Sequence, residues 1–501
     1  MRRLNMKKGF KNTLRNTKKI MKKGNFIAAV LLVASFTQCS VFEYEDLPYR
    51  DDHIPGQDLP VTKQSIHVEV TGIRSAALIL QNGSDSLNVP ADGAYTFSEK
   101  VTSGESYNVT LTVSPNGALN CAMNSNTGTM PTSDVTVIIT CANNWTIVSA
   151  GDAHSLALRG DGSLWAWGNN ENGQLGDGGT ITETCSVYKC STIPVKIGTA
   201  TWIAIAAGNN HSLGIQSDGT LWAWGDNTYG QLGDTSITQR NAPVKIGGAT
   251  WKSVSANGIT GYGAHSLGIQ SDDTLWAWGG NAYGQIGDNS NTQRNAPVKI
   301  GGATWKSASA GGVHSLGIQS DDTLWAWGSD MIGQIGNGAT TGDQLAPVQI
   351  GGAAWLSASA GGLYSAGIQA NGSLWTWGSD MSHELGDGAP TTGQTSPFEI
   401  DNPNTYSLIF AGSNHTLGIR SDGTLYAWGS NNYGALGLPN TIFSETAPVN
   451  TSTESWVIAD MGASHSLAIR NDNTLWAWGY NVVGQVGDGT TNDSYTFVQI
   501  P

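Results

Sequence analysis

Charged residues are scarce in this sequence, at 13 % of its 501 residues, and the basic ones are unevenly placed. Residues 1–38 hold ten of the 25 Lys and Arg residues and no Asp or Glu. Residues 39–501 therefore carry 15 basic and 39 acidic side chains, a net charge of −24. Beyond residue 38 there is no stripe of basic residues interleaved with aromatic ones. Because phosphate backbones repel an acidic body, we expect no binding of nucleic acid.

A long apolar run is also missing. The apolar stretch near the start, Phe26 to Ala34, has about nine residues, whereas a helix needs about 20 to cross the hydrocarbon core of a bilayer. This stretch follows a basic segment that ends at Lys23, which is the pattern of a secretory signal. We therefore expect residues 1–38 to be a signal peptide.

From Met21 onward, MKKGNFIAAVLLVASFTQC resembles a complete bacterial lipoprotein leader. The resemblance implies cleavage before Cys39, lipidation of Cys39, and Met21 as the alternative start of the chain. Phe36 and Gln38 depart from the usual pattern, which has Leu and a small residue there. A plain secretory signal and an uncleaved anchor remain alternatives. We expect a protein of the bacterial cell envelope, lipid-anchored to the outer membrane or cell surface, or a secreted one.

Cysteine is rare, with five residues in the whole chain. Apart from Cys39, the cysteines form two local pairs, Cys121 with Cys141 and Cys185 with Cys190. In an oxidising compartment these pairs favour two disulfides. The competing interpretation, a zinc site, lacks both a C-x-x-C spacing and a nearby histidine. We expect no metal and no cofactor.

Glycine and tryptophan, by contrast, are abundant, with 65 and 19 residues, and they predict an all-β chain of short strands and tight turns. Residues 39–62 are acidic, contain three prolines and predict a solvated linker. Residues 63–143 contain five segments of alternating polarity, IHVEV, AALIL, YTFSEKV, YNVTLTV and VTVIIT, which predict a small β-sandwich. This region resembles the immunoglobulin-like modules of bacterial surface proteins, and the resemblance implies a spacer.

Residues 144–501 consist of seven repeats of about 50 residues. Each repeat reads as an opening aromatic residue, an SAG-like triplet, HSLGI, SDGTLWAWG, a GQLGDG turn and APVKIGG. In LWAWG the two tryptophans are two residues apart, so both point to one face of a strand and the alanine points to the other. Each repeat therefore supplies about four strands, the size of one propeller blade. The opening residues are Trp145, Trp202, Trp251, Trp305, Trp355, Tyr406 and Trp456.

These motifs resemble the repeats of the regulator of chromosome condensation family over about residues 144–501. The resemblance implies a seven-bladed β-propeller. The family's eukaryotic founder is a nuclear guanine-nucleotide exchange factor for a small GTPase, and other members are secreted bacterial proteins, including an inhibitor of β-lactamases. This chain departs from the founder in its export signal and its acidic body. Both departures argue against exchange activity.

Two sets of repeated residues could be taken for catalytic or metal-binding groups. One repeat position holds a histidine in six repeats and Tyr364 in the seventh, and we favour a structural hydrogen bond there over a metal ring. The aspartates of the SDGT segments resemble the sialidase Asp-box only loosely, so we interpret them as turn formers. Glycoside hydrolysis also needs two positioned carboxylates. The histidines are His154, His211, His265, His314, His415 and His465.

The loops in which the repeats differ are better candidates for function, because packing already uses the repeated positions. The candidate binding residues in them are Val187, Tyr188, Ile259, Tyr262, Ile442 and Phe443. These loops contain neither a nucleophile with a base nor a phosphate-binding loop. We therefore predict a monomeric, noncatalytic protein that binds a protein partner and meets a membrane only through its lipid anchor. The alternatives are an exchange-factor-like regulator and an inhibitor of a secreted enzyme.

The repeat phase also predicts how the ring closes. Each PVKI segment precedes the next opening aromatic residue by a few positions, so we assign both to one blade. The blade of Trp145 then lacks a strand, and we expect the end of the chain, Phe497 to Ile500, to supply it. Residues 134–140 are the alternative.

Overall fold

A computed structural model of the chain describes residues 62–71, 78–90, 93–113, 119–257, 263–340, 342–389 and 393–501. The predicted signal peptide, Cys39, the linker up to residue 61, Ile259 and Tyr262 lie outside these residues. Within the described part the fold is all-β, and the one helix is a short 3-10 turn, η2 (Asn432–Gly434). None of the described segments forms a helix that is long and apolar enough to cross a membrane.

The first region is two four-stranded sheets that share one hydrophobic core. In β2, Ile66, Val68 and Val70 are buried and alternate with more exposed residues, as the sequence pattern predicts. One sheet has the order β5 (Gly93–Thr96), β2 (Ile66–Thr71), β10 (Val135–Asn143) and β8 (Leu119–Asn124). The other has the order β4 (Asp85–Val89), β3 (Leu78–Asn82), β7 (Ser106–Val113) and β9 (Thr127–Thr129), and β1 (Lys63–Gln64) pairs with β6 (Val101–Thr102). The five predicted segments all contain strand, and the structure adds β1, β4, β8 and β9.

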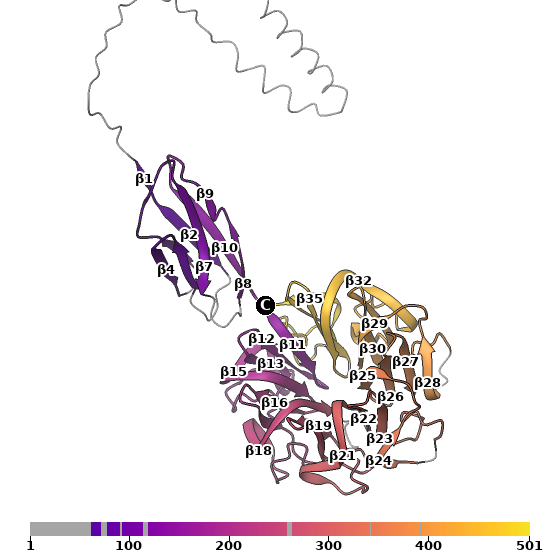
Figure 1. Ribbon diagram of the computed structural model, residues 1–501. Coiled ribbons are helices and arrows are strands. Elements are labelled where there is room, and N and C mark those ends of the chain that lie inside the picture. Colours follow the sequence, from indigo (N-terminus) through magenta and orange to yellow (C-terminus); the bar gives the residue numbers. More distant parts are fainter. Residues whose placement is uncertain are drawn as a thin grey trace, which may run out of the picture. The chain divides into compact units, whose positions relative to one another are not determined.

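The strands from Trp145 onward pair into successive antiparallel groups of four, which we number 1 to 7 (Figure 1). Group 1 comprises β11 (Trp145–Ala150), β12 (His154–Arg159), β13 (Ser163–Asn169) and the first half of β15 (Tyr188–Ala207), on which β14 (Thr184–Cys185) also pairs. Group 2 comprises the second half of β15, β16 (His211–Gln216), β17 (Thr220–Gly225) and the first half of β18 (Arg240–Asn257). Group 3 comprises the second half of β18, β19 (His265–Gln270), β20 (Thr274–Gly279) and the first half of β21 (Arg294–Ala310).

Groups 4 to 7 continue the pattern. Group 4 comprises the second half of β21, β22 (His314–Gln319), β23 (Leu324–Gly328) and β24 (Gln344–Gln349). Group 5 comprises β25 (Trp355–Ala360), β26 (Tyr364–Gln369), β27 (Leu374–Gly378) and β28 (Gln394–Ile400). Group 6 comprises β29 (Tyr406–Ala411), β30 (His415–Arg420), β31 (Thr424–Ser430) and the first half of β32 (Ser444–Met461). Group 7 comprises the second half of β32, β33 (His465–Arg470), β34 (Leu475–Gly479) and β35 (Ser494–Ile500).

The predicted closing strand is wrong. Each PVKI segment pairs with the LWAWG strand that precedes it, so Val195 lies opposite Ala166 in group 1. Pairing with the next group begins only at Trp202, after Gly198 at φ +60° turns the chain from one sheet to the next. Group 1 is therefore complete without the chain end. β35 pairs with β34 in its own group, and β10 pairs with β2 and β8, so the alternative is also wrong.

Side-chain packing joins the last group to the first instead. Trp145 and Trp167 of group 1 share a buried cluster with Leu475, Ala477 and Ile500 of group 7. Figure 1 shows the strands of these two groups next to each other. Ala166 belongs to a different cluster, shared with group 2, so the tryptophans and the alanine of LWAWG do face opposite ways.

Candidate functional site

The repeated histidines form a structural ring of hydrogen bonds. His154 Nε2 lies 2.9 Å from Ser212 Oγ in the next group, and Ser212 Oγ donates to the carbonyl of Gln174 at 2.8 Å. The serine proton is used on that carbonyl, so the imidazole Nε2–H must donate to the serine. The same bond recurs from group to group and returns from His465 to Ser155 at 2.9 Å. At the position of Tyr364 the phenol hydroxyl lies 2.8 Å from Thr416 Oγ1.

Burial keeps these histidines uncharged. It lowers the pKa of His154 to about 3 and that of His211 to about 4. A neutral imidazole with its Nε2–H committed to a serine is a packing element, so the structure shows the predicted structural bond. The SDGT aspartates likewise form turns, with Asp218 Oδ1 accepting the Thr220 backbone N–H at 3.0 Å.

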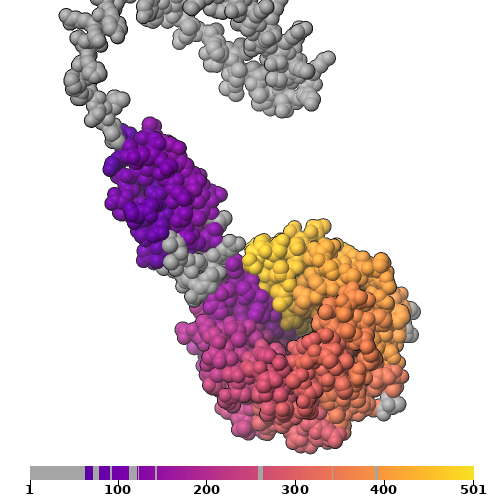
Figure 2. Space-filling model, viewed as in Figure 1, coloured from indigo at the N-terminus to yellow at the C-terminus, as the bar shows by residue number. Residues whose placement is uncertain are grey.

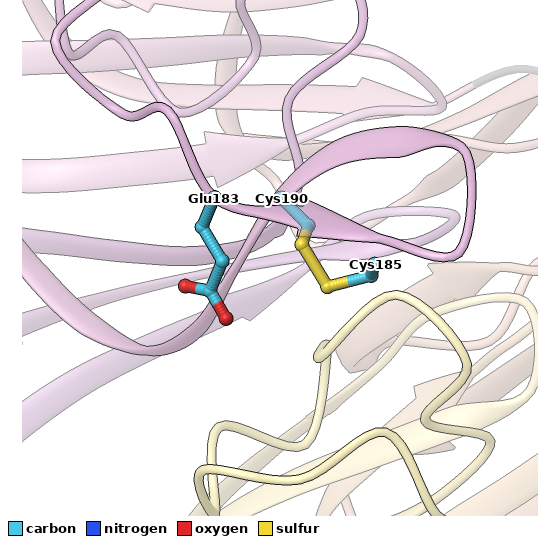
Figure 3. Close-up of side chains that lie close together, drawn as sticks. All are labelled: Glu183, Cys185 and Cys190. Atoms are coloured by element: carbon cyan, nitrogen blue, oxygen red, sulfur yellow. A yellow bond between two sulfur atoms is a disulfide. The ribbon is translucent and has the colours of Figure 1, made fainter.

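The predicted disulfide between Cys185 and Cys190 is present, with a Cα–Cα distance of 5.8 Å. Figure 3 shows Glu183 beside it, but both sulfurs are used in the bond and offer no thiolate to a metal. The bond closes a hairpin whose tip presents Val187, 78 % exposed, and Tyr188, 46 % exposed.

The other cysteine pair lies in the first region. The register of β8 and β10 places the backbone of Cys121 opposite that of Cys141, and Cys121 is disulfide-bonded. The side chain of Cys141 is outside the described part of the chain. The pairing stays a prediction, and this register favours it.

The predicted loop of group 6 is held by its own repeat asparagine. Asn431 Nδ2 donates to the carbonyl of Ile442 at 2.8 Å, and the Asn431 N–H donates to the carbonyl of Phe443 at 2.8 Å. Ile442 is partly buried, whereas Phe443 is 77 % exposed. Of this pair, Phe443 is therefore the side chain available to a partner.

Contacts of group 7 with groups 6 and 1 make the loops of these three groups neighbours at one end of the repeats. We call this the loop end, because the SAG-x-x-H and GQLG loops all lie there and the SDGT turns lie at the opposite end. The Cys185–Cys190 hairpin packs against Val483 of group 7. Tyr433 of group 6 lies 4.6 Å, centroid to centroid, from Tyr480 of group 7.

We call the solvent-accessible apolar and aromatic side chains of these loops the aromatic rim. Its residues are Val187, Tyr188, Tyr433, Phe443, Tyr480 and Val482. Tyr433, Tyr480 and Val482 were not among the predicted binding residues, because they stand in repeat turns rather than in divergent loops. Tyr480 could have been found by comparing repeats, since the residue after LWAWG is small or polar in the other six.

A central cavity of about 320 Å³ opens between the innermost strands of the groups, and Figure 2 shows a hollow in the middle of the repeats. In four groups a serine on the innermost strand accepts a backbone N–H from the next group, as Ser149 Oγ does from Ala207 N at 3.0 Å. Group 7 has Asp460 at this position, and its carboxylate accepts the Ala150 N–H at 3.0 Å. Burial raises the pKa of Asp460 to about 6 and also raises that of the nearby Asp152. Among the described residues that line the cavity, the charged side chains are therefore these two acidic ones, Asp152 and Asp460.

Four-stranded groups stacked around a central cavity define a repeat protein of the β-propeller class. Two models of the regulator of chromosome condensation (RCC1) repeat match this chain and together cover more than half of it. The chain belongs to this repeat family. One model matches residues 161–215, 218–257, 272–318, 371–419 and 422–469, and the other matches residues 145–174, 202–231, 407–435 and 458–485.

Two curated relatives illustrate the range of the family. The chain is 32 % identical over 159 residues to the probable E3 ubiquitin-protein ligase HERC6 of Homo sapiens and 28 % identical over 154 residues to the ultraviolet-B receptor UVR8 of Arabidopsis thaliana. Each match covers 31 % of this chain. The chain spans only 15 % of the ligase and 33 % of the receptor, so the match is to a part of each.

Solved structures share the fold at low identity. Prp20p from Saccharomyces cerevisiae aligns over 68 % of this chain and 86 % of its own, with 20 % identity and a TM-score of 0.59. Human WBSCR16 aligns over 68 % of this chain and 94 % of its own, with 19 % identity and a TM-score of 0.59. At such identities the likeness establishes the fold and leaves function to be argued from the site.

Proposed function

We propose that this chain is a noncatalytic protein-interaction protein of the cell envelope that binds its partner through the aromatic rim. The observation that carries the proposal is the gathering of exposed apolar side chains from groups 1, 6 and 7 at the loop end. Exposed apolar patches on rigid scaffolds mark contact surfaces. Aromatic residues are also enriched at the energetic centres of protein interfaces.

The remaining regions fit this role. Lipidation at Cys39 would anchor the chain, and the β-sandwich of residues 63–143, proposed to be immunoglobulin-like, would act as a spacer ahead of a seven-bladed propeller. Protein binding has a precedent on this fold, because the yeast neighbour is described by its binding to Gsp1p and histones.

Photo-cross-linking from the exporting cell tests the proposal. The full-length protein would carry a photoreactive phenylalanine analogue at Val187 or Phe443. Ile237, 59 % exposed at the loop end of group 2, is the matched control position. We expect one discrete cross-linked protein from positions 187 and 443 and none from 237. Equal yields from all three positions, or none from any, would overturn the proposal.

A further inference from the structure

Two tyrosines of the aromatic rim pack together beside a carboxylate, and a third stands on the hairpin that packs against the same turn. Tyr433 and Tyr480 have ring centroids 4.6 Å apart and planes inclined at 50°. Partial burial, followed by the neighbouring Tyr433, Asp493 and Tyr188, raises the pKa of Tyr480. Asp493 is fixed beside Tyr480, because its Oδ1 accepts the N–H of Asn481 at 2.9 Å. We call these four residues the tyrosine cluster.

The tyrosine cluster differs from the equivalent turns of other groups in its backbone conformation and in the element that supplies Tyr188. Tyr433 has φ +61°, a conformation that is costly for a bulky residue, whereas its counterpart in group 2, Tyr229, has an ordinary φ. Tyr188 comes from a separate element, the hairpin that the Cys185–Cys190 bond closes. Tyr433 and Tyr188 are 48 % and 46 % exposed, so their rings are accessible from solvent.

Tyrosine rings have a negative face that attracts cations, and a carboxylate adds a full charge. Elsewhere in the chain, a tyrosine ring and a carboxylate together hold a cationic side chain. In group 6 the Arg420 guanidinium lies 3.6 Å from the Tyr426 ring centroid and pairs with Asp401 at 2.6 Å. Every cation–π pair among the described residues involves Arg159, Arg420 or Arg470, each away from the tyrosine cluster.

We propose that the packed rings of Tyr433 and Tyr480, the carboxylate of Asp493 and the ring of Tyr188 on the adjoining hairpin bind an arginine side chain of the partner protein. This inference rests on the proposed function, because the cluster lies within the aromatic rim. A planar guanidinium can stack on one ring while it donates to the carboxylate, which an ammonium cannot do. The acidic body, with its net charge of −24 beyond residue 38, favours a basic partner surface.

The probe is the tripeptide acetyl-Gly-Arg-Gly-amide, with citrulline and lysine versions for comparison. Binding would be followed by NMR of full-length protein with ¹³C-labelled tyrosine rings, assigned through single Tyr→Phe variants. We expect saturable shifts at Tyr188, Tyr433 and Tyr480. The citrulline peptide should bind about tenfold more weakly, because its side chain is uncharged. Equal binding of the arginine peptide and either comparison peptide would overturn the inference.

Variants separate recognition from folding. Tyr480→Ala and Asp493→Asn should each weaken arginine binding by about threefold to tenfold, whereas Tyr480→Phe, which keeps the ring, should retain it. Tyr229→Ala in group 2 is the matched control and should leave binding unchanged. Undiminished binding in Tyr480→Ala would contradict the site. Cross-linking at Val187 and Phe443 without arginine binding would overturn this inference alone, and arginine binding without cross-linking would overturn only the proposed function.

Discussion

Groups 2 to 4 and groups 6, 7 and 1 are built on one pattern but have diverged to different degrees. SLGIQSDGTLWAWG begins at Ser212, and SLGIQSDDTLWAWG begins at both Ser266 and Ser315. The second strand ends in glutamine in groups 2 to 5 and in Arg420, Arg470 and Arg159 in groups 6, 7 and 1. These three groups also supply the aromatic rim. The comparison shows that the sequence differences are concentrated in three adjacent groups, 6, 7 and 1, on both sides of the contact between groups 7 and 1.

What the two sets share explains why the divergence is tolerated. In every group the second LWAW aromatic donates its Nε1–H to a backbone carbonyl of the preceding group, as Trp224 does to Gln174 at 2.8 Å and Trp167 to Gln485 at 2.9 Å. The serine or threonine beside the histidine position donates to that same carbonyl. The contacts between groups thus use backbone carbonyls of the GQLG loops and not loop side chains, so the exposed loop side chains are free to change.

The largest expected effect tests whether the contact between groups 7 and 1 is as stabilising as the contact between groups 1 and 2. Trp167→Ala, at the joint of groups 7 and 1, and Trp224→Ala, at that of groups 1 and 2, should each lower the free energy of unfolding by about 3–5 kcal/mol, because each removes a fully buried indole. Denaturant unfolding of both variants measures this. A loss at Trp167 below half of that at Trp224 would show that the closing joint is the weaker one.

The next effect concerns the disulfide-closed hairpin of group 1. Replacing Cys185 and Cys190 together by serine should cost about 2 kcal/mol, as expected for a short closed loop. Substitution is preferable to a reductant, since Cys121 is also disulfide-bonded. Because Tyr188 stands on this hairpin, the variant should also bind the arginine peptide more weakly. Unchanged unfolding and unchanged binding would show that the hairpin holds its shape without the bond.

The strands and the packing faces were predictable because they depend on local pattern. Period-two alternation identifies LWAWG and IHVEV as strands, and seven repetitions make the family resemblance specific. The phase of the repeat was not predictable, because PVKI lies next to the opening tryptophan in sequence. The turn at Gly198 nevertheless places the two in different sheets. In the first region β4 was missed, since its five residues DSLNV contain only two apolar side chains.

The candidate site was only half predictable for a related reason. Val187, Tyr188 and Phe443 stand in loops that differ visibly from their counterparts, so a comparison of repeats finds them. Tyr433 and Tyr480 stand in turns that match the repeat, and their importance arises from contact across groups 6 and 7. Asp460 could have been identified as a departure from the SAG triplet, but only the structure shows that it lies in the central cavity.

A third test uses an aspartate that has replaced a repeat asparagine. Asp380 stands where group 2 has Asn227, whose Nδ2 donates to the carbonyls of Ser236 and Thr238. Asp380 is 2 % exposed, its Oδ2 has no hydrogen-bond partner in the described structure, and burial raises its pKa to about 6. The folded state therefore binds this proton more tightly than the unfolded state does, and stability should fall as the pH rises from about 4 to about 6.

Asp380→Asn should remove the contribution of this carboxyl group to the decline, leaving those of Asp460 and Asp152, and should raise the free energy of unfolding at pH 8 by about 1–2 kcal/mol. Unfolding curves of the variant and the parent at pH 4 and pH 8 provide the measurement. Asn227→Asp in group 2 is the reciprocal variant and should introduce the same decline. If Asp380→Asn leaves stability at pH 8 unchanged, the buried carboxylate has a partner that offsets its charge.

The smallest expected effect on stability tests whether the aromatic rim is surface that folding does not require. Val187→Ser and Phe443→Ser each remove an apolar side chain that is more than three-quarters exposed, so each should change the free energy of unfolding by less than about 0.5 kcal/mol. Leu356→Ser, at a residue 63 % exposed in group 5, should be equally neutral and serves as the control.

The three variants should differ only in partner binding, which should fall for Val187→Ser and Phe443→Ser and persist for Leu356→Ser. With the rim changed by these serines, partner capture would be measured by cross-linking from position 482. If Phe443→Ser destabilises the protein as strongly as a buried tryptophan variant, the rim is part of the core and the surface interpretation is wrong.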